Sequence, residues 1–146
     1  MSQRQIKLTI DSCLDDVFLV GLATSKTCSY IRMTELECYQ MEVSVVEAVT
    51  NVIKHSYGGE SGHDVEVVVK LQKEQVVIEV TDTGKPLAES DIRITRDARA
   101  QFDFDRLSDG GRGLFIMGSY MDEMGCRIED GRNTLTLVKS RVVAQV

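Results

Sequence analysis

Residues 34–59 read TELECYQMEVSVVEAVTNVIKHSYGG and carry the signals of one long helix. Thr34 and Glu37 have the spacing of a capping box, in which each side chain accepts a hydrogen bond from the backbone of the other at a helix N-terminus. The two glycines at 58–59 suit a helix end, because glycine readily adopts the left-handed conformation found there. The valine-rich middle favours a strand by propensity, but the run is longer than most strands. We therefore predict a helix over about 35–57.

On either side of this helix, some segments have apolar residues that alternate with polar ones, as in strands. In other segments the apolar residues recur at helical spacing. In chain order the predicted elements are a strand at 6–10, a helix at 14–31, the helix at 35–57, strands at 65–71 and 76–80, a loop at 85–112, a helix at 114–121 and a hairpin turning at 130–131. This order favours helices packed on one face of a mostly antiparallel sheet, an α+β two-layer sandwich. The length of 146 residues fits a single domain over 1–146.

Composition excludes several classes of function. Lys and Arg number 17 against 23 Asp and Glu, a formal net charge of -6, so the positive charge needed for general nucleic-acid binding is absent. The four cysteines form no C-x-x-C pair, which predicts reduced thiols and neither a zinc site nor a disulfide framework. No apolar run approaches about 18 residues, and the N-terminus is polar. We therefore expect a cytoplasmic protein that does not interact with membranes.

Polar residues form a narrow seam along the long helix. Ser44, Glu47, Asn51 and the pair Lys54-His55 recur at helical spacing on one face. An exposed helix face gives such a seam, but so does a binding site. The carboxylate of Glu47 and the carboxamide of Asn51 lie one turn apart and suit magnesium phosphate chemistry. Asn51 would supply one oxygen to Mg²⁺ beside nucleotide phosphates, and Glu47 would act as a neighbouring base.

A second candidate, D-T-G at 82–84, follows the strand at 76–80. Asp82 falls on the same face as the strand's apolar residues, which directs its carboxylate toward the covered side of the sheet. An ionised carboxylate accepts hydrogen bonds and suits the exocyclic amine of adenine. Gly84 would let a flat base approach the backbone. An ordinary turn after a strand is the alternative for this short motif.

A third candidate is the glycine-rich segment 110–113, which leads into the helix predicted from Leu114. Free N–H groups and the positive end of the helix dipole would converge there on an anion such as phosphate. The segment is neither a P-loop nor a dinucleotide fingerprint, because the required residues after the glycines are missing. A flexible hinge without a ligand is the alternative.

Taken in order, the three sites resemble the N, G1 and G2 boxes of the GHKL ATPases, a superfamily that includes gyrase, the heat-shock chaperone, histidine kinases and mismatch-repair proteins. The matching residues are Glu47-x-x-x-Asn51-Val-Ile-Lys54-His55, Asp82-Thr-Gly84 and Gly111-Arg-Gly113-Leu114. The phrases EAVTNVIKHSYGG, VTDTGKP, DGGRGLFIMGSYMDEMG and NTLTLVK are most similar to the bacterial anti-sigma-factor serine/threonine kinases. The resemblance extends from Ile6 to Lys139 and implies the Bergerat ATP-binding fold.

The resemblance also implies roles for individual residues with ATP and Mg²⁺ as cofactors. Glu47 would be the catalytic base, Asn51 the Mg²⁺ ligand and Asp82 the partner of the adenine amino group. The remaining nucleotide-binding residues would be Lys54 and His55 on the phosphate side, Gly84, Gly111, Gly113 and Leu114 around the pocket, Thr134 near adenine, and Arg106 and Arg112 of an ATP lid over 85–112.

Family members phosphorylate a serine on a small anti-sigma-factor antagonist of the STAS type and sequester a sigma factor, typically as homodimers. The resemblance implies the same partners here. A regulatory module that binds ATP and a partner with little or no phosphotransfer is the alternative. The catalytic domain of a histidine kinase is disfavoured, because the chain has no room for an upstream helix pair with a phospho-accepting histidine.

Overall fold

The computed structural model describes residues 4–86, 92–95 and 112–141. The elements in chain order are β1 (Arg4–Asp11), the 3₁₀ turn η1 (Leu14–Asp16), α1 (Val17–Tyr30), α2 (Glu35–Asn51), the π-helical turn η2 (Val52–Ser56), β2 (Asp64–Leu71), β3 (Gln75–Asp82), β4 (Ile92–Thr95), α3 (Arg112–Tyr120), β5 (Glu123–Glu129) and β6 (Arg132–Ser140).

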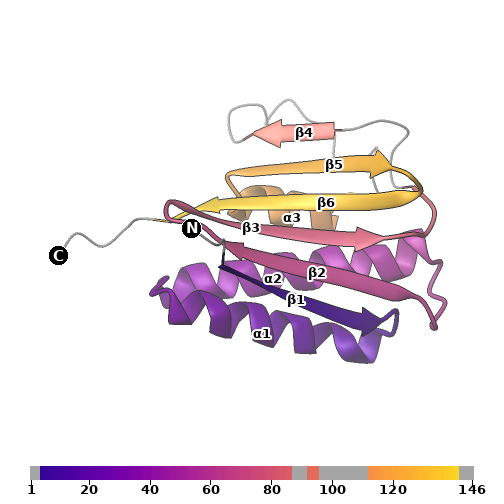
Figure 1. The fold of residues 1–146 in the computed structure, drawn as a ribbon, viewed down its shortest axis with the longest axis horizontal. Helices are drawn as coiled ribbons and strands as arrows, with labels where there is room; N and C mark the ends of the chain where they lie inside the picture. The colour runs from indigo at the N-terminus through magenta and orange to yellow at the C-terminus, as the bar shows by residue number, and fades with distance from the viewer. Residues whose placement is uncertain (1–3, 87–91, 96–111, 142–146) are drawn as a thin grey trace.

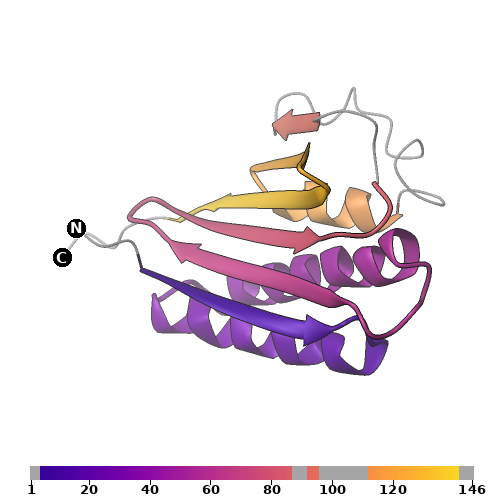
Figure 2. The ribbon, with the colours of Figure 1, turned by 45° about the vertical axis from the view of Figure 1, so that its right-hand side comes forward.

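The strands form one sheet in the order β1-β2-β3-β6-β5-β4, and every neighbouring pair is antiparallel. Helices α1, α2 and α3 all lie on one face of this sheet (Figures 1 and 2). The predicted α+β two-layer sandwich is therefore confirmed. No helix in the described part of the chain is both long and apolar enough to span a membrane.

The core lies between the sheet and the helices, and its residues follow the two periodicities of strand and helix. The sheet contributes alternate residues, and the helices contribute the stripe that faces them. Fully or almost fully buried members are Val65, Val67, Val69, Val76, Ile78, Val80, Met124 and Leu137 from the strands, and Val17, Val20, Met41, Val45, Val49, Met117 and Met121 from the helices and the residue after α3.

Helix α2 begins with the predicted capping box. Glu37 N donates to Thr34 Oγ1 at 3.1 Å, and Thr34 N donates to Glu37 Oε1 at 2.9 Å. The β-branched run is helical, because its valines face the sheet and helix neighbours, and tertiary burial overrides propensity. The helical segment also ends before the two glycines at 58–59, which have φ angles of 61° and 81°. Its last turn, η2, is π-helical, a distortion that often marks functional sites.

The prediction of a loop over 85–112 is wrong at Ile92–Thr95. These residues form β4 on the edge of the sheet and pair with β5. Four residues are too few for alternation to separate a strand from a turn. The predicted start of the last helix is also corrected, because α3 begins at Arg112 and not at Leu114. The rest of the predicted lid, including Arg106, lies outside the described residues.

Candidate functional site

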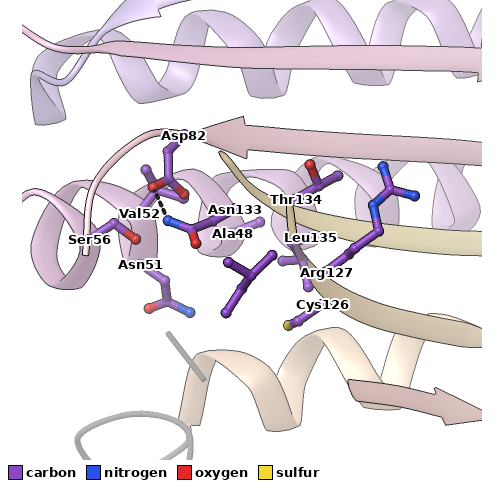
Figure 3. A pocket seen from close by; sticks show the side chains of 11 residues that line it. Ala48, Asn51, Val52, Ser56, Asp82, Cys126, Arg127, Asn133, Thr134 and Leu135 are labelled. Atoms are coloured by element: carbon purple, nitrogen blue, oxygen red, sulfur yellow. Dashed lines mark hydrogen bonds between the residues drawn. The ribbon is translucent and has the colours of Figure 1, made fainter. Parts of the chain in front are cut away.

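A cavity lies where η2 and the end of α2 meet the ends of β3, β5 and β6 (Figure 3). It contains about 480 Å³ of empty space, part of it open to solvent. The lining residues are Ala48, Asn51, Val52 and Ser56 from the helical side, and Asp82, Cys126, Arg127, Ile128, Asn133, Thr134 and Leu135 from the sheet.

Asp82 ends β3, a central strand of the sheet, and is only 4% exposed. It shares the inward face of β3 with Val80, as the two-residue period of a strand requires. Its Oδ1 accepts hydrogen bonds from the Gly84 backbone nitrogen and from Asn133 Nδ2, each at 2.9 Å. The predicted inward carboxylate is therefore present, and it lines the cavity.

Burial raises the pKa of Asp82, because desolvation penalises the charged carboxylate, while hydrogen bonds from Asn133, Gly84 and Ser56 oppose the shift. A carboxylate offers about four acceptor sites on its two oxygens. After these three protein donors, Asp82 retains capacity for one donor from a ligand. An exocyclic amine matches that requirement, whereas a carbonyl oxygen would be repelled.

The backbone at Gly84 lies very close to other protein atoms and not to the open cavity. A Cβ atom at this position would lie 2.3 Å from the Ser56 carbonyl oxygen and 2.9 Å from Tyr57 Cδ1. The next residue, Lys85, donates its backbone N–H to the same Ser56 oxygen at 2.8 Å. Gly84 therefore lets the segment after β3 pack directly on η2, which brings Asp82 next to the helical wall of the cavity.

The polar seam of the long helix lies partly at the cavity and partly outside it. Asn51 lines the cavity, and its buried Nδ2 has no hydrogen-bond partner. Glu47, half-buried and one turn before Asn51, is not among the lining residues. His55 is half-buried and Lys54 is exposed, and neither belongs to the lining. Since Ser44 is fully buried, the seam is not simply an exposed helix face.

The glycine-rich segment is described only in part. Gly111 lies outside the described residues, and Arg112, Gly113 and Leu114 form the first turn of α3. Gly113 is therefore helical and does not belong to the loop before the helix. Helix α3 packs against α2, the helix that carries Asn51.

Asn133 is a site residue that the sequence analysis missed. It stands directly opposite Asp82 in the β3–β6 pair and is 9% exposed. Thr134, the residue predicted near adenine, is opposite Thr81, and the two hydroxyl oxygens are 3.2 Å apart. Adjacent strand residues point to opposite faces, so Asn133 and not Thr134 presents its side chain beside Asp82. The role predicted for Thr134 stays a prediction.

The family model described as "Histidine kinase-like ATPase domain" matches residues 14–139, most of the chain. The chain belongs to this family. The ATPase domain is also similar to relatives of known name. Serine-protein kinase RsbW of Bacillus pumilus is 28% identical over 132 residues, which cover 86% of this chain and 80% of the relative. The anti-sigma F factor of Pasteuria penetrans is 28% identical over 152 residues and matches 100% of this chain and 99% of its own.

A solved structure has the same fold as this ATPase domain. The crystal structure of the RsbU and RsbW domains of a Mycobacterium tuberculosis protein aligns with this chain with a TM-score of 0.66 and 18% identity over 98% of this chain. The chain spans 34% of that longer protein chain. The resemblance to the GHKL anti-sigma-factor kinases is thus confirmed by the family match and by the names of the relatives.

Membership of this family implies the use of ATP, and the cavity fits an adenine nucleotide. Asp82 supplies an acceptor inside a mainly apolar space, as the exocyclic amine and flat ring of adenine require.

The residues also fit Mg²⁺ held chiefly by phosphates and water. Within the described ranges, no three His, Cys, Asp or Glu side chains gather as a metal cluster, but Asn51 presents an amide whose nitrogen has no partner. Rotation of that amide would offer its oxygen to a hard cation.

Proposed function

We propose that this chain is an ATP-dependent serine/threonine protein kinase that acts as an anti-sigma factor and phosphorylates a STAS-type anti-sigma-factor antagonist. One observation carries the proposal: the inward carboxylate of Asp82 and the amide of Asn51 line the same cavity. The protein substrate and the sigma-factor partner are supported by the names of the relatives from Bacillus pumilus and Pasteuria penetrans, of which the match covers 80% and 99%.

ATP would bind with its adenine amine at Asp82 and its phosphates toward the Asn51 end of the cavity. Asn51 would contribute one oxygen to Mg²⁺, and the metal would neutralise charge on the phosphates as the phosphoryl group transfers. Lys54 and His55 follow Asn51 by three and four residues and would serve the phosphate side. Thr134 would complete the adenine end of the pocket.

Glu47 would act as the general base. It lies on α2 one turn before Asn51 and is not part of the cavity wall. From there its carboxylate would approach the proposed metal. In that position it would accept the proton of the attacking serine hydroxyl while the oxygen bonds to the γ-phosphorus and the bond to ADP breaks. The protein's contribution is otherwise positioning and stabilisation of charge.

The remaining nucleotide contacts would come from the segment before α3 and from its first turn. Gly111, Arg112, Gly113 and Leu114 would surround the phosphates, and the segment 85–112 would serve as the ATP lid, with Arg106 available to the phosphates. The whole chain, 1–146, would work as one cytoplasmic domain that forms a homodimer and binds neither membranes nor nucleic acid directly.

An ATP-binding regulatory module that sequesters its partner with little or no phosphotransfer is the second candidate. The position of Glu47 outside the cavity lining favours it, since a base must reach the attacking hydroxyl. The two candidates agree on ATP and partner binding and differ only in transfer.

Transfer is tested by incubating the full chain with Mg²⁺, [γ-³²P]ATP and STAS-type candidate substrates, then locating the label by phosphopeptide analysis. The kinase proposal expects label on a serine, lost by at least about a hundredfold in Glu47→Gln while ATP affinity is kept. Glu74→Gln is the matched control, because Glu74 is exposed in the turn before β3, at the strand end opposite Asp82. ATP binding without label on any candidate supports the regulatory module. Label that is undiminished in Glu47→Gln removes Glu47 from the role of base.

A further inference from the structure

Asn133 is placed to contact whatever Asp82 binds. The two residues are directly opposite each other in neighbouring central strands, and both line the cavity. Asn133 Nδ2 lies 2.9 Å from Asp82 Oδ1 and 3.0 Å from the Gly84 carbonyl oxygen. Its side chain is therefore held by two hydrogen bonds from a single nitrogen, in a residue that is 9% exposed.

These two bonds fix which end of the amide faces the cavity. The Gly84 carbonyl is an acceptor, and so is the ionised Asp82 carboxylate, so the group that meets both must be the NH₂ donor. Turning the amide over would place its oxygen against two other oxygens at hydrogen-bond distance, which is electrostatically unfavourable. Asn133 Oδ1 consequently points away from Asp82 and toward the cavity, as Figure 3 shows.

The wall of the cavity thus presents two kinds of oxygen side by side, the carboxylate of Asp82 and the amide oxygen of Asn133. Both accept hydrogen bonds, and they come from neighbouring strands on the same face of the sheet. A flat ligand with an NH₂ group carries two donor hydrogens that diverge from one nitrogen. A pair of adjacent acceptors matches that group, whereas a single carboxylate matches half of it.

We propose that Asn133 is a specificity-determining residue that accepts the second hydrogen of the adenine amino group through Oδ1, while Asp82 accepts the first. The inference rests on the proposed function, because it assumes that the cavity binds ATP. Nucleotides with a carbonyl in place of the amine meet two acceptors and are excluded more strongly than one carboxylate alone could exclude them. Nucleotides whose amine carries an alkyl group lose one of the two bonds.

A double-mutant cycle between protein and ligand tests the proposal, with dissociation constants of ATP and N6-methyl-ATP measured by calorimetry for the full chain and for Asn133→Ala. We expect the natural protein to bind ATP about tenfold more tightly than N6-methyl-ATP, the effect of one lost hydrogen bond plus the methyl group. Asn133→Ala removes the Oδ1 acceptor and leaves space for the methyl group. We therefore expect the ratio of the two dissociation constants to fall to about one.

Two further variants serve as a second test and as a control. Asn133→Thr has a hydroxyl that can donate to Asp82 but is too short to reach the position of the amide oxygen, so it too is expected to lose discrimination. Thr136→Val changes an outward residue of the same strand and is expected to keep the tenfold ratio. Thermal unfolding of each variant identifies the folded ones, and Asn133→Thr decides the outcome if Asn133→Ala does not fold.

The possible failures are distinguishable. If the natural protein binds neither nucleotide, the proposed function fails and the inference fails with it. If it binds ATP but both Asn133 variants weaken ATP and N6-methyl-ATP by the same factor, Asn133 only positions Asp82, and the direct contact is overturned while ATP binding stands.

Discussion

The hydroxyl of Tyr57 lies 2.9 Å from the backbone nitrogen of Thr83 and accepts its hydrogen bond. The same hydroxyl donates to the carbonyl oxygen of Asp64 at 2.7 Å, where β2 begins. Tyr57 directly follows η2, and Thr83 lies between Asp82 and Gly84. One buried phenol therefore ties the end of the long helix to the segment that carries the carboxylate of the site.

Tyr57→Phe removes this hydroxyl and little else. The Thr83 N–H and the Asp64 carbonyl then lose a partner in a part-buried environment, which costs roughly 1–3 kcal/mol of unfolding free energy. We also expect ATP affinity to fall several-fold, because Asp82 is held less firmly. Urea unfolding and calorimetry measure the two effects. Tyr30→Phe is the matched control, since Tyr30 is 76% exposed; equal behaviour of the two variants would contradict the anchoring role.

Gly84→Ala tests the contact between the segment after β3 and η2. The new methyl group would lie 2.3 Å from the Ser56 carbonyl oxygen, so backbone must move. We expect a loss of about 3 kcal/mol or more, the upper range for overpacking. Gly58→Ala is a useful comparison, because Gly58 has a φ of 61° and no atom within 4 Å of its Cβ position. That variant should lose only about 1–2 kcal/mol from its left-handed backbone. A smaller loss of unfolding free energy in Gly84→Ala than in Gly58→Ala would show that η2 moves to accommodate the methyl group at little cost.

Local signals predicted most of the fold correctly. The capping box at Thr34 and the glycines at 58–59 bounded α2 against its strand propensity, and Asp130-Gly131 marked the last hairpin, where both residues have positive φ. Asp82 was predicted inward from the two-residue period alone. In each case the information lies within a few residues of the feature, which is why one sequence suffices.

Features that depend on pairing between distant segments could not be predicted in this way. Asn133 becomes a site residue only through its register opposite Asp82, 51 residues earlier. A polar residue in the alternation of β6 is the available signal, but the family resemblance points to the neighbouring Thr134. The close neighbour of Gly84 is likewise distant in sequence, namely Ser56 of η2.

Cys28 is expected to be unreactive in the folded protein. Burial raises the pKa of its thiol to about 12, with the nearby Cys38 and Glu37 adding to the shift. At pH 8 only about one thiol in ten thousand would then be ionised, and the thiolate is the reactive form. Labelling with a thiol reagent at pH 8, followed by peptide mapping, should modify half-buried Cys13 without denaturant and Cys28 only in denaturant. Comparable labelling rates for Cys13 and Cys28 without denaturant would contradict the burial of Cys28, which is 0% exposed in α1.

Asn51→Ala tests the metal assignment. If Asn51 supplies an oxygen to Mg²⁺, the variant should bind ATP with an affinity that no longer depends on the metal. Calorimetry with ATP in Mg²⁺ and in EDTA measures this dependence. Thr50→Ala, on the adjacent half-buried position of α2, serves as the matched control and should retain the natural response. An undiminished Mg²⁺ effect in Asn51→Ala would place the metal ligand elsewhere.

Asp82→Asn should abolish ATP binding while keeping the fold. The replacement retains one oxygen for the donors Gly84 and Asn133 but turns the other into an NH₂ group, which repels an amine donor. We expect ATP affinity to fall by at least about a hundredfold, by analogy with sites that lose a required polar match. Asp15→Asn, at an exposed position of η1, is the control and should bind ATP normally.

The stability of Asp82→Asn relative to the natural protein should depend on pH. Burial raises the pKa of Asp82 above its ordinary value of 3.8, so the folded protein binds this proton more tightly than the unfolded chain does. The ionised carboxylate therefore destabilises the fold at neutral pH, and this contribution disappears as the pH falls through the raised pKa toward 3.8. Urea unfolding at a series of pH values should show the advantage of the variant greatest near pH 7 and shrinking with acid. An advantage that grows as the pH falls would mean that hydrogen bonds from Asn133, Gly84 and Ser56 outweigh burial and hold the pKa below its ordinary value.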